Sequence, residues 1–372
     1  MVHNLTTNFH QKLLKIAILG AGYAGLATAW HLLHEFQYQV MIDIFDPLPI
    51  GCGASGISSG LLHPFAGMHA KKSWEADSGM NATHELISES VKAGHSPVVL
   101  SKGIFRPATS EQTRNDFQKQ AEKDAGVEWW DPARIKHQIP SIEFGDLPYG
   151  GGIYVKEGMT IDVTLYLQGL WQACARGGAR LIQKAVTDYE QISCYDQIIF
   201  AIGHQTDEFL HFPIKKVKGQ ILKLKWPKGL PPLPFSLIGK GYLVMAEEGS
   251  ACYAGATFER SFASLKPEGR IAKQLILEKI LPFFPKIQEM PIMEVKAGVR
   301  ATTSSHLPLV DQIEEKFWIL TALGSKGLLW HAFLGKRLAQ AILNNDLSFL
   351  PQEARHASHS PARSTREPRQ QD

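Results

Sequence analysis

The stretch that most constrains the fold lies near the start of the chain and reads KIAILGAGYAG, residues 15–25. It places an apolar run, typical of a strand buried in a parallel sheet, directly before three glycines at the spacing G-x-G-x-x-G. Such glycines allow a tight turn, a close approach of the backbone to a pyrophosphate, and close packing of a helix on the strand. The sequence therefore predicts a strand over 16–19, a helix over 23–36 and a dinucleotide site between them. The three glycines are Gly20, Gly22 and Gly25.

An acidic residue about twenty positions after the glycines completes this pattern, because it can hydrogen-bond ribose hydroxyls from the end of the second strand. The segment 42–46 reads IDIFD and supplies two candidates. Asp46 ends the expected strand, whereas Asp43 lies within it, one pleat out of phase. Asp46 is the predicted ribose-binding residue.

Composition narrows the class of protein. With 372 residues, of which 44% are hydrophobic and 20% charged, the chain is long enough for two globular domains. The four cysteines are scattered without a CxxC pair, so we expect no structural metal, no disulfide framework and a reducing cytoplasm. Residues 1–14 do not resemble a secretory signal. The most apolar window, 16–33, is interrupted by His31 and the glycines, so no membrane span is expected.

The formal net charge of +3 is too small to predict a polyanionic partner. Six lysines nevertheless fall in one short segment without an acidic residue among them. Alternation over 221–226 favours a strand with its lysines on a solvated face, and the alternative is a nucleic-acid groove. The six are Lys215, Lys216, Lys218, Lys223, Lys225 and Lys228.

Hydrophobic periodicity divides the chain into two kinds of segment. Helix and buried-strand patterns recur around 162–202 and 317–344, as in a parallel sheet covered on both faces. Between 214 and 310 strands dominate, with one helix over 269–281, which indicates an antiparallel sheet. We expect a discontinuous nucleotide-binding domain over 12–77, 152–212 and 309–349, a substrate domain over 78–151 and 213–308, and a disordered tail over 350–372.

Taken together, the motifs resemble the D-amino-acid oxidase and glycine oxidase superfamily of FAD-dependent amine oxidoreductases, up to about residue 347. Among its members the motifs look closest to the oxidase domain of the bifunctional enzyme that completes methylaminomethyl-uridine in tRNA; its methyltransferase domain has no counterpart here. The motifs are ILGAGYAGLATAWHL with IFD, GASGISSGLLHP, DQIIFAIG, VKGQ, GYLVM, GATFE, AGVRATTSSHLPLV and LTALGSKGLL.

This resemblance implies an α/β fold, with a Rossmann-like FAD-binding domain of glutathione-reductase type and an inserted antiparallel-sheet substrate domain. It also implies non-covalent FAD, since no cysteine lies near 300–303. The cofactor would lie against Gly20, Gly22, Gly25, Asp46, Ser55, Gly203, Gly324, Ser325, Lys326, Gly327 and Leu328, the last five at a second helix N-terminus.

The substrate residues implied by the resemblance lie in the strand-rich domain. Arg300 matches the arginine that pairs with a substrate carboxylate, and Tyr242 matches a tyrosine at the substrate end of the flavin. Many relatives have Asp where this chain has Ser305, and Arg where it has Lys326. We interpret His63 and His306 as structural histidines, and Trp129, Trp130 and Trp330 as packing residues.

Three functions follow from these features. The first is an FAD oxidase of the carboxymethylaminomethyl group on the wobble uridine of tRNA. The second is an oxidase or dehydrogenase of free glycine, sarcosine or D-amino acids, or another N-substituted glycine. The third is a flavin-binding protein without turnover. The expected partners are a small-molecule amine or tRNA.

Overall fold

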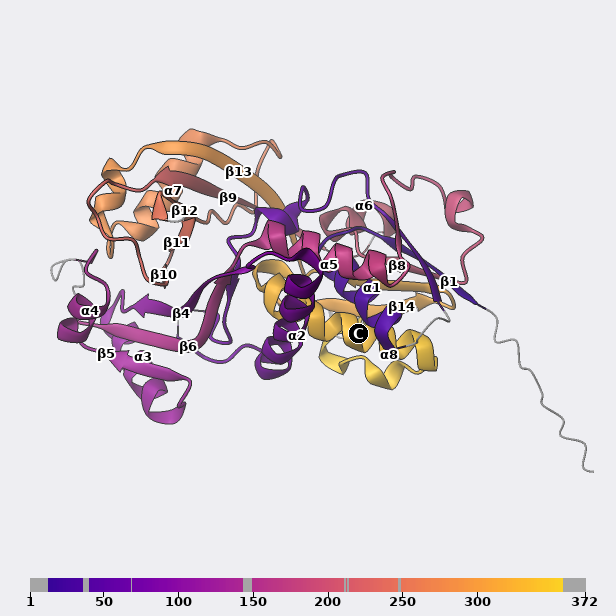
Figure 1. The fold of residues 1–372 in the computed structure, drawn as a ribbon, viewed down its shortest axis with the longest axis horizontal. Coiled ribbons are helices and arrows are strands. Elements are labelled where there is room, and N and C mark those ends of the chain that lie inside the picture. The colour runs from indigo at the N-terminus through magenta and orange to yellow at the C-terminus, as the bar shows by residue number, and fades with distance from the viewer. Residues whose placement is uncertain are drawn as a thin grey trace, which may run out of the picture.

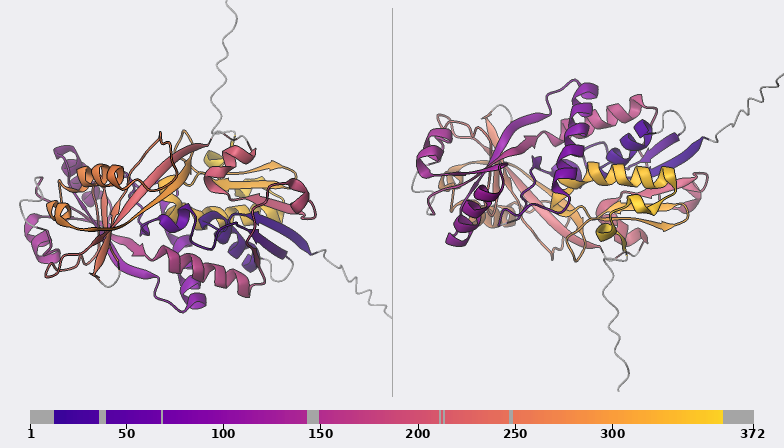
Figure 2. Two further views of the ribbon diagram at one scale, coloured as in Figure 1. Left: turned by 90° about the horizontal axis from the view of Figure 1, so that it is seen from above. Right: turned by 90° about the horizontal axis from the view of Figure 1, so that it is seen from below.

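The computed structural model describes residues 13–35, 40–67, 69–142, 149–210, 212, 214–246 and 249–356 (Figure 1). The molecule is elongated, with a six-stranded sheet and its covering helices at one end and a nine-stranded sheet at the other. Views from above and below show the same two-ended arrangement (Figure 2).

The six-stranded sheet has the order β14-β15-β8-β1-β2-β7, in which all neighbours are parallel except β14 and β15. Helices α1, α2, α5 and α8 pack around its main core, and the long helix α8 lies directly against α1. The buried-strand patterns expected within 162–202 correspond to two short strands, over 180–182 and 197–200. The strands are β1 (Leu14–Leu19), β2 (Val40–Phe45), β7 (Arg180–Ile182), β8 (Gln197–Phe200), β14 (Leu309–Glu314) and β15 (Phe317–Thr321). The helices are α1 (Tyr23–Glu35), α2 (Ala76–Gly94), α5 (Val163–Arg176), α6 (Thr206–Leu210) and α8 (Gly327–Asn344).

The nine-stranded sheet has the order β13-β9-β12-β11-β10-β4-β6-β3, and β5 pairs with β6. Its neighbours are antiparallel except β4 and β10, which are parallel. The strands are β3 (Leu61–Leu62), β4 (Val99–Pro107), β5 (Val127–Trp130), β6 (Gly152–Ile161), β9 (Lys215–Lys225), β10 (Ser236–Ile238), β11 (Tyr242–Ala246), β12 (Ala251–Gly255) and β13 (Ile292–Thr302). The helices at this end are α3 (Glu111–Lys123), α4 (Pro132–Gln138) and α7 (Gly269–Ile280).

Helix starts follow the sequence closely. The Ser110 side chain accepts a hydrogen bond from the Thr113 backbone N–H at the start of α3, and Asp162 does the same for α5 from Leu165. Both are side-chain caps that satisfy an amide left free at a helix N-terminus. The α/β fold class predicted from the motifs is confirmed by the structures to which this one is similar, reported below.

Two segments lie on the other side of the predicted domain division. Helix α2 was assigned to the substrate domain, but it packs on α5 and α8, and its Thr83 hydroxyl donates to Leu328 O over 2.9 Å. Strand β6 was assigned to the nucleotide-binding domain, but it pairs with β4 in the nine-stranded sheet. Non-local packing decides both placements, and neither leaves a local sequence signal.

Two further expectations need correction. The tail is ordered beyond residue 350, because Ala354 is fully buried and Arg355 Nε donates to Asp311 Oδ1 over 3.1 Å; residues 357–372 lie outside the described part of the chain. Lys218 does not lie on a solvated face, because its side chain is buried and paired with Glu268. Of the described helices, none is long and apolar enough to cross a membrane.

Candidate functional site

A cavity of about 650 Å³ lies between the two sheets and is lined from both. One wall comes from the start of α1, the end of β8 and the turn before α8. The other comes from β9, β11 and β13, and the loop 54–67 closes a side. Ten of the predicted site residues line this cavity, and Gly20, Gly25 and Asp46 do not. The ten are Gly22, Ser55, Gly203, Tyr242, Arg300, Gly324, Ser325, Lys326, Gly327 and Leu328.

At each of the three N-terminal glycines, an added Cβ would come too close to a neighbouring atom. Gly20 has a φ of +105°, and a Cβ there would lie 2.4 Å from Ala201 O. A Cβ on Gly25 would lie 1.9 Å from Gly20 O, so this glycine permits the close packing of α1 on the turn. Gly22 faces the cavity, where a Cβ would lie 2.8 Å from Ser55 Oγ. The first turn of α1 is thereby brought to the cavity wall.

The start of α1 is suited to an anion. The first turn of the helix contains no acidic residue, so the positive end of its dipole is not compensated there. The Tyr23 backbone N–H donates to Ser55 Oγ over 3.1 Å, which places an acceptor oxygen where a phosphate oxygen would be held. A helix N-terminus of this kind, with no Cβ at Gly22, fits a diphosphate group.

Asp46 lies behind the glycine turn. Its carboxylate accepts hydrogen bonds from the Ala21 N–H, over 2.8 Å, and from the Leu48 N–H, over 2.9 Å. These contacts hold the turn to the end of β2. Its role on a ribose stays a prediction. The neighbouring Asp43 makes different contacts: its carboxylate pairs with Arg180 and accepts a hydrogen bond from the Tyr195 hydroxyl.

A second helix N-terminus reaches the cavity at the turn 324–326, where Gly324 has a φ of +58°. The first turn of α8 also contains no acidic residue. Lys326 lies over the ring of Trp330, 4.7 Å from its centroid, and burial lowers the Lys326 pKa. Trp330 also donates from Nε1 to Trp74 O, as a packing residue does.

Arg300 lies in the wall formed by β13 and β9. Its guanidinium lies flat over Gly219, where a Cβ would come within 2.3 Å of it, and its Nη1 donates to Thr257 O over 3.4 Å. Burial lowers the Arg300 pKa. Within the described residues Arg300 forms no ion pair with a carboxylate. Its remaining N–H donors are therefore available to a ligand.

Tyr242 lies near Arg300 in the same wall. A Cβ on Gly255 would lie 2.3 Å from the Tyr242 hydroxyl, so the ring lies over a glycine in the adjacent strand. Burial raises the pKa of the Tyr242 phenol, and a hydrogen bond with Ser59 and the charge of Arg300 oppose that rise. The phenol stays protonated at neutral pH and can donate a hydrogen bond into the cavity.

A network of buried polar side chains lies behind Arg300. Gln220 donates from its backbone N–H to Thr257 Oγ1 and from Nε2 to Glu259 Oε1, over 2.8 and 2.9 Å. Thr257 donates to the same carboxylate, and the Glu268 N–H donates to Gln220 Oε1 over 2.7 Å. The motifs VKGQ and GATFE thus meet in one network that fixes the residue whose carbonyl accepts from Arg300.

Arg106 and His63 line the cavity although neither was among the predicted site residues. Arg106 of β4 lines the cavity, and the only sequence signal for it is a lone arginine in the apolar run GIFRP. His63, which was interpreted as structural, also lines it, and its Nδ1 is buried without a partner among the described residues. Burial and the charge of Arg106 lower the His63 pKa to about 3.

The remaining residues of interest lie outside this cavity. His306 has a φ of +60° and lines a smaller cavity beside Arg300 and Lys326. Ser305 accepts a hydrogen bond from the Leu307 N–H in the turn before β14. Trp130 is buried and stacks on Tyr154. No group of three or more His, Cys, Asp or Glu residues in the described ranges is placed to hold a metal ion.

Comparison with known proteins identifies a family. The model of the DAO family, described as FAD dependent oxidoreductase, matches residues 15–341. The tRNA 5-methylaminomethyl-2-thiouridine biosynthesis bifunctional protein MnmC of Idiomarina loihiensis is 24% identical, over 91% of this chain and 57% of that protein. The bifunctional protein ThiO/ThiG of a Nostoc species is 24% identical, over 79% of this chain and 47% of that protein. The chain spans about half the length of these relatives.

Among solved structures, glycine oxidase from Geobacillus kaustophilus superposes with a TM-score of 0.75 at 18% sequence identity. The superposition covers 90% of this chain and 95% of that structure. This similarity shows a shared fold.

Proposed function

We infer that this chain, which belongs to the DAO family of FAD dependent oxidoreductases, oxidises the C–N bond of a secondary amine that carries a carboxylate, an N-substituted glycine. The observation that carries the inference is Arg300, a cation in the cavity wall without an ion pair among the described residues. A planar guanidinium takes a carboxylate through two parallel hydrogen bonds, which fixes the substrate's orientation as well as its position.

The residues present fit FAD. The start of α1, with Gly22 and Ser55, would hold the diphosphate, and the turn 324–328 would face the flavin ring. A helix N-terminus and main-chain amides at that turn favour negative charge on the ring system. FAD, when bound, supplies the acceptor for the hydride that leaves the carbon next to the amine nitrogen.

The chain's own residues bind and orient the substrate. Arg300 pairs with the carboxylate, and Tyr242 donates a hydrogen bond beside it. Lys279 of α7 also lines the cavity and donates to Ala256 O over 2.7 Å. Two cations near the substrate amine disfavour its protonated form, so the amine reacts neutral and no dedicated base is needed. Water then splits the resulting imine into glyoxylate and an amine.

The carboxymethylaminomethyl group of the tRNA wobble uridine is a second candidate, because the similarity to the bifunctional tRNA-modifying protein extends over 91% of this chain. The lysine-rich segment 215–228 gives this candidate less support in the structure than its sequence composition gave. Lys218 is buried, so the six lysines do not form one continuous basic face. Free glycine, sarcosine and D-amino acids would use the same Arg300.

An anaerobic flavin-bleaching experiment tests these candidates, because it measures reduction whatever the later electron acceptor. The purified FAD-loaded protein is mixed with sarcosine, longer N-alkylglycines, glycine, D-alanine and undermodified tRNA. We expect bleaching by N-alkylglycines. Bleaching by tRNA alone would favour the second candidate, and no bleaching by any of them would refute the proposed function.

Arg300→Met, with FAD still bound, should raise the amine concentration for half-reduction by at least about tenfold, because a charged hydrogen-bonded pair is lost. Lys296→Met is the matched control. It removes a positive charge from the same strand, but Lys296 pairs with Glu294 and does not line the cavity. Equal behaviour of the two variants would show that Arg300 does not bind the carboxylate.

A further inference from the structure

Arg106 is a further cation of the same cavity, in addition to Arg300, Lys279 and Lys326, and it has no counterion among the described residues. The Arg106 residue is 4% exposed, and its guanidinium lies 5.3 Å from the centroid of the Phe117 ring. Its Nη1 and Nη2 donate to Phe65 O and Gly67 O, over 2.6 and 2.5 Å. Its Nε is buried without a partner in the described part of the chain. Two carbonyls thus satisfy two of the five N–H groups, and the charge stays uncompensated.

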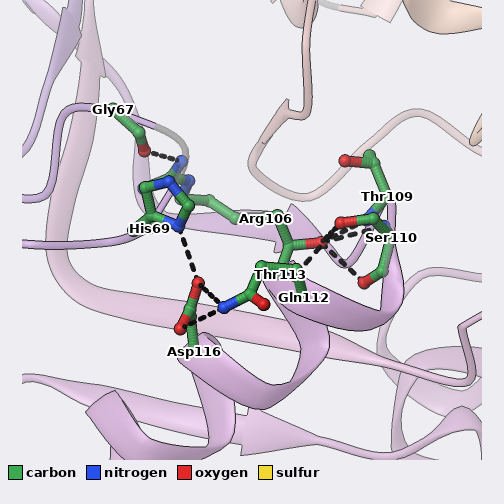
Figure 3. A network of polar contacts seen from close by, with 8 residues as sticks. All are labelled: Gly67, His69, Arg106, Thr109, Ser110, Gln112, Thr113 and Asp116. Atoms are coloured by element: carbon green, nitrogen blue, oxygen red, sulfur yellow. Dashed lines mark hydrogen bonds and ion pairs between the residues drawn. The ribbon is translucent and has the colours of Figure 1, made fainter.

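The surroundings hold Arg106 in place. Figure 3 shows Arg106 reaching the Gly67 carbonyl, with His69 hydrogen-bonded to Asp116 on α3 close by. Gln112 donates to the same carboxylate from one turn earlier in α3 (Figure 3). The loop that carries the two acceptor carbonyls is therefore held both by Arg106 and by the hydrogen bond between His69 and Asp116. Arg106 cannot leave its position without breaking these contacts, so its free donor has a fixed place.

Strand register places Arg106 at the Tyr242 end of the cavity. Phe105 pairs with Leu237, and the next residue of β10, Ile238, pairs with Tyr242. Arg106, Ile238 and Tyr242 therefore form one row across three strands, spanning about 10 Å at the usual strand spacing, and all three line the cavity. The predicted diphosphate site at Gly22 lies on the wall formed by the start of α1, whereas Arg106 belongs to β4 of the nine-stranded sheet.

His63 adds a second free polar atom. Its pKa, lowered to about 3 by burial and by Arg106, keeps the imidazole neutral at physiological pH. A neutral imidazole has one N–H donor, and the buried Nδ1 can carry it. A buried charge and a buried donor without partners each cost free energy, and a single acidic group in the cavity would satisfy both.

We propose that Arg106 and His63 form a second acid-binding subsite, so that the substrate is a secondary amine with two carboxylates, one held at Arg300 and the other at Arg106. This proposal rests on the proposed function and names its substrate class: an N-substituted glycine whose substituent ends in a second carboxylate. Arg106 Nε–H and the His63 ring are the donors to that second group.

The first test compares diacid amines with matched monoacids by anaerobic bleaching. Iminodiacetate and N-(2-carboxyethyl)glycine are each paired with the compound in which an amide replaces the second acid. We expect each diacid to half-reduce the protein at a concentration about tenfold below that of its amide, because a charged hydrogen bond is roughly twice as strong as a neutral one. Equal concentrations would overturn the proposal.

Variants separate substrate binding from a structural role. Arg106→Gln should raise the half-reduction concentration of the diacid about tenfold more than that of its amide, and His63→Leu should reduce the same preference while Arg106 still donates to the loop carbonyls. A loss that is equal for diacid and amide in both variants would show that these residues only support the loop. Loss of reduction by tRNA alone in Arg106→Gln would assign the second anion to an RNA phosphate and overturn the dicarboxylate.

A binding measurement makes the proposal independent of turnover. Oxydiacetate has an ether oxygen in place of the amine, and methoxyacetate lacks the second acid. Titration of the oxidised protein, followed by the flavin absorbance, should show tighter binding of oxydiacetate, and Arg106→Gln should remove the difference. Equal binding of the two by the unmodified protein would overturn the second subsite. Absence of bleaching with preserved discrimination would refute only the proposed oxidation.

Discussion

The ion pair between Lys218 and Glu268 predicts an asymmetric response to mutation. Lys218 Nζ lies 2.5 Å from Glu268 Oε2; the Lys218 side chain is 0% exposed and that of Glu268 is 39% exposed. Glu268→Gln leaves a buried ammonium without its counterion, and we expect it to lower the free energy of unfolding by about 3 kcal/mol. Lys218→Met fills the same volume with an apolar chain and leaves a carboxylate that water reaches. We expect a cost below about 1 kcal/mol for that change.

The double variant, Lys218→Met with Glu268→Gln, provides the decisive comparison with the two single variants. Because Lys218→Met removes the buried charge that makes Glu268→Gln costly, the double variant should be about as stable as Lys218→Met alone. Urea denaturation of the FAD-loaded proteins, followed by tryptophan fluorescence, measures all four, and Trp226 reports from the same half of the molecule. Equal costs for the two single variants, or additive costs in the double variant, would refute the asymmetry.

Three other predictions use the contacts around the site. Gly25→Ala, whose Cβ would lie 1.9 Å from Gly20 O, should cost about 1–3 kcal/mol and lower the FAD content after purification, whereas Gly53→Ala, with no atom within 4 Å, should change neither. Gly219→Ala should displace the Arg300 guanidinium and raise the amine concentration for half-reduction while FAD stays bound; unchanged reduction would contradict this. Burial lowers the pKa of three histidines, so the unfolded chain binds more protons below about pH 6.5, and stability should fall on acidification by about 1.4 kcal/mol per pH unit for each. His31→Gln should reduce the pH dependence of the unfolding free energy by the contribution of one proton, about 1.4 kcal/mol per pH unit, as measured by denaturation between pH 7 and pH 4.5. An unchanged pH dependence would show that His31 does not contribute to it. The three are His31, His63 and His331, with pKa values of about 3, 3 and 4.

The nucleotide-binding half was predictable because its requirements are local. The constraint at Gly25 comes from the carbonyl of Gly20, five residues earlier in the same motif, whereas the close contact at Gly20 is with Ala201, which is distant in sequence. The cap at Asp162 likewise depends on an amide three residues away. A short sequence pattern is sufficient to predict the local structure around a residue wherever that residue's partner lies within the same turn or strand.

Residues whose partners are distant in sequence were not predictable. The lysine-rich segment favoured a solvated face for Lys218, but Glu268, fifty residues later, pairs with the buried Lys218 side chain and neutralises it. The lone arginine in GIFRP did not predict a cavity residue, because the place of Arg106 depends on the order of β4, β10 and β11, which only the folded sheet sets. The position of α2 against α8 depends on packing in the same way.

The wall of the cavity explains why glycines recur in motifs that have no phosphate to approach. Gly219 and Gly255 lie in neighbouring strands, and each leaves room above the sheet for one polar side chain, Arg300 and Tyr242 respectively. A Cβ at either position would lie 2.3 Å from the polar group, so any larger residue would force that group away from the sheet. The two motifs VKGQ and GATFE therefore fix both the polar network behind the wall and the position of the groups on its surface. If Arg300 binds the substrate as proposed, the substrate's orientation depends on the backbone of the sheet as much as on Arg300 itself.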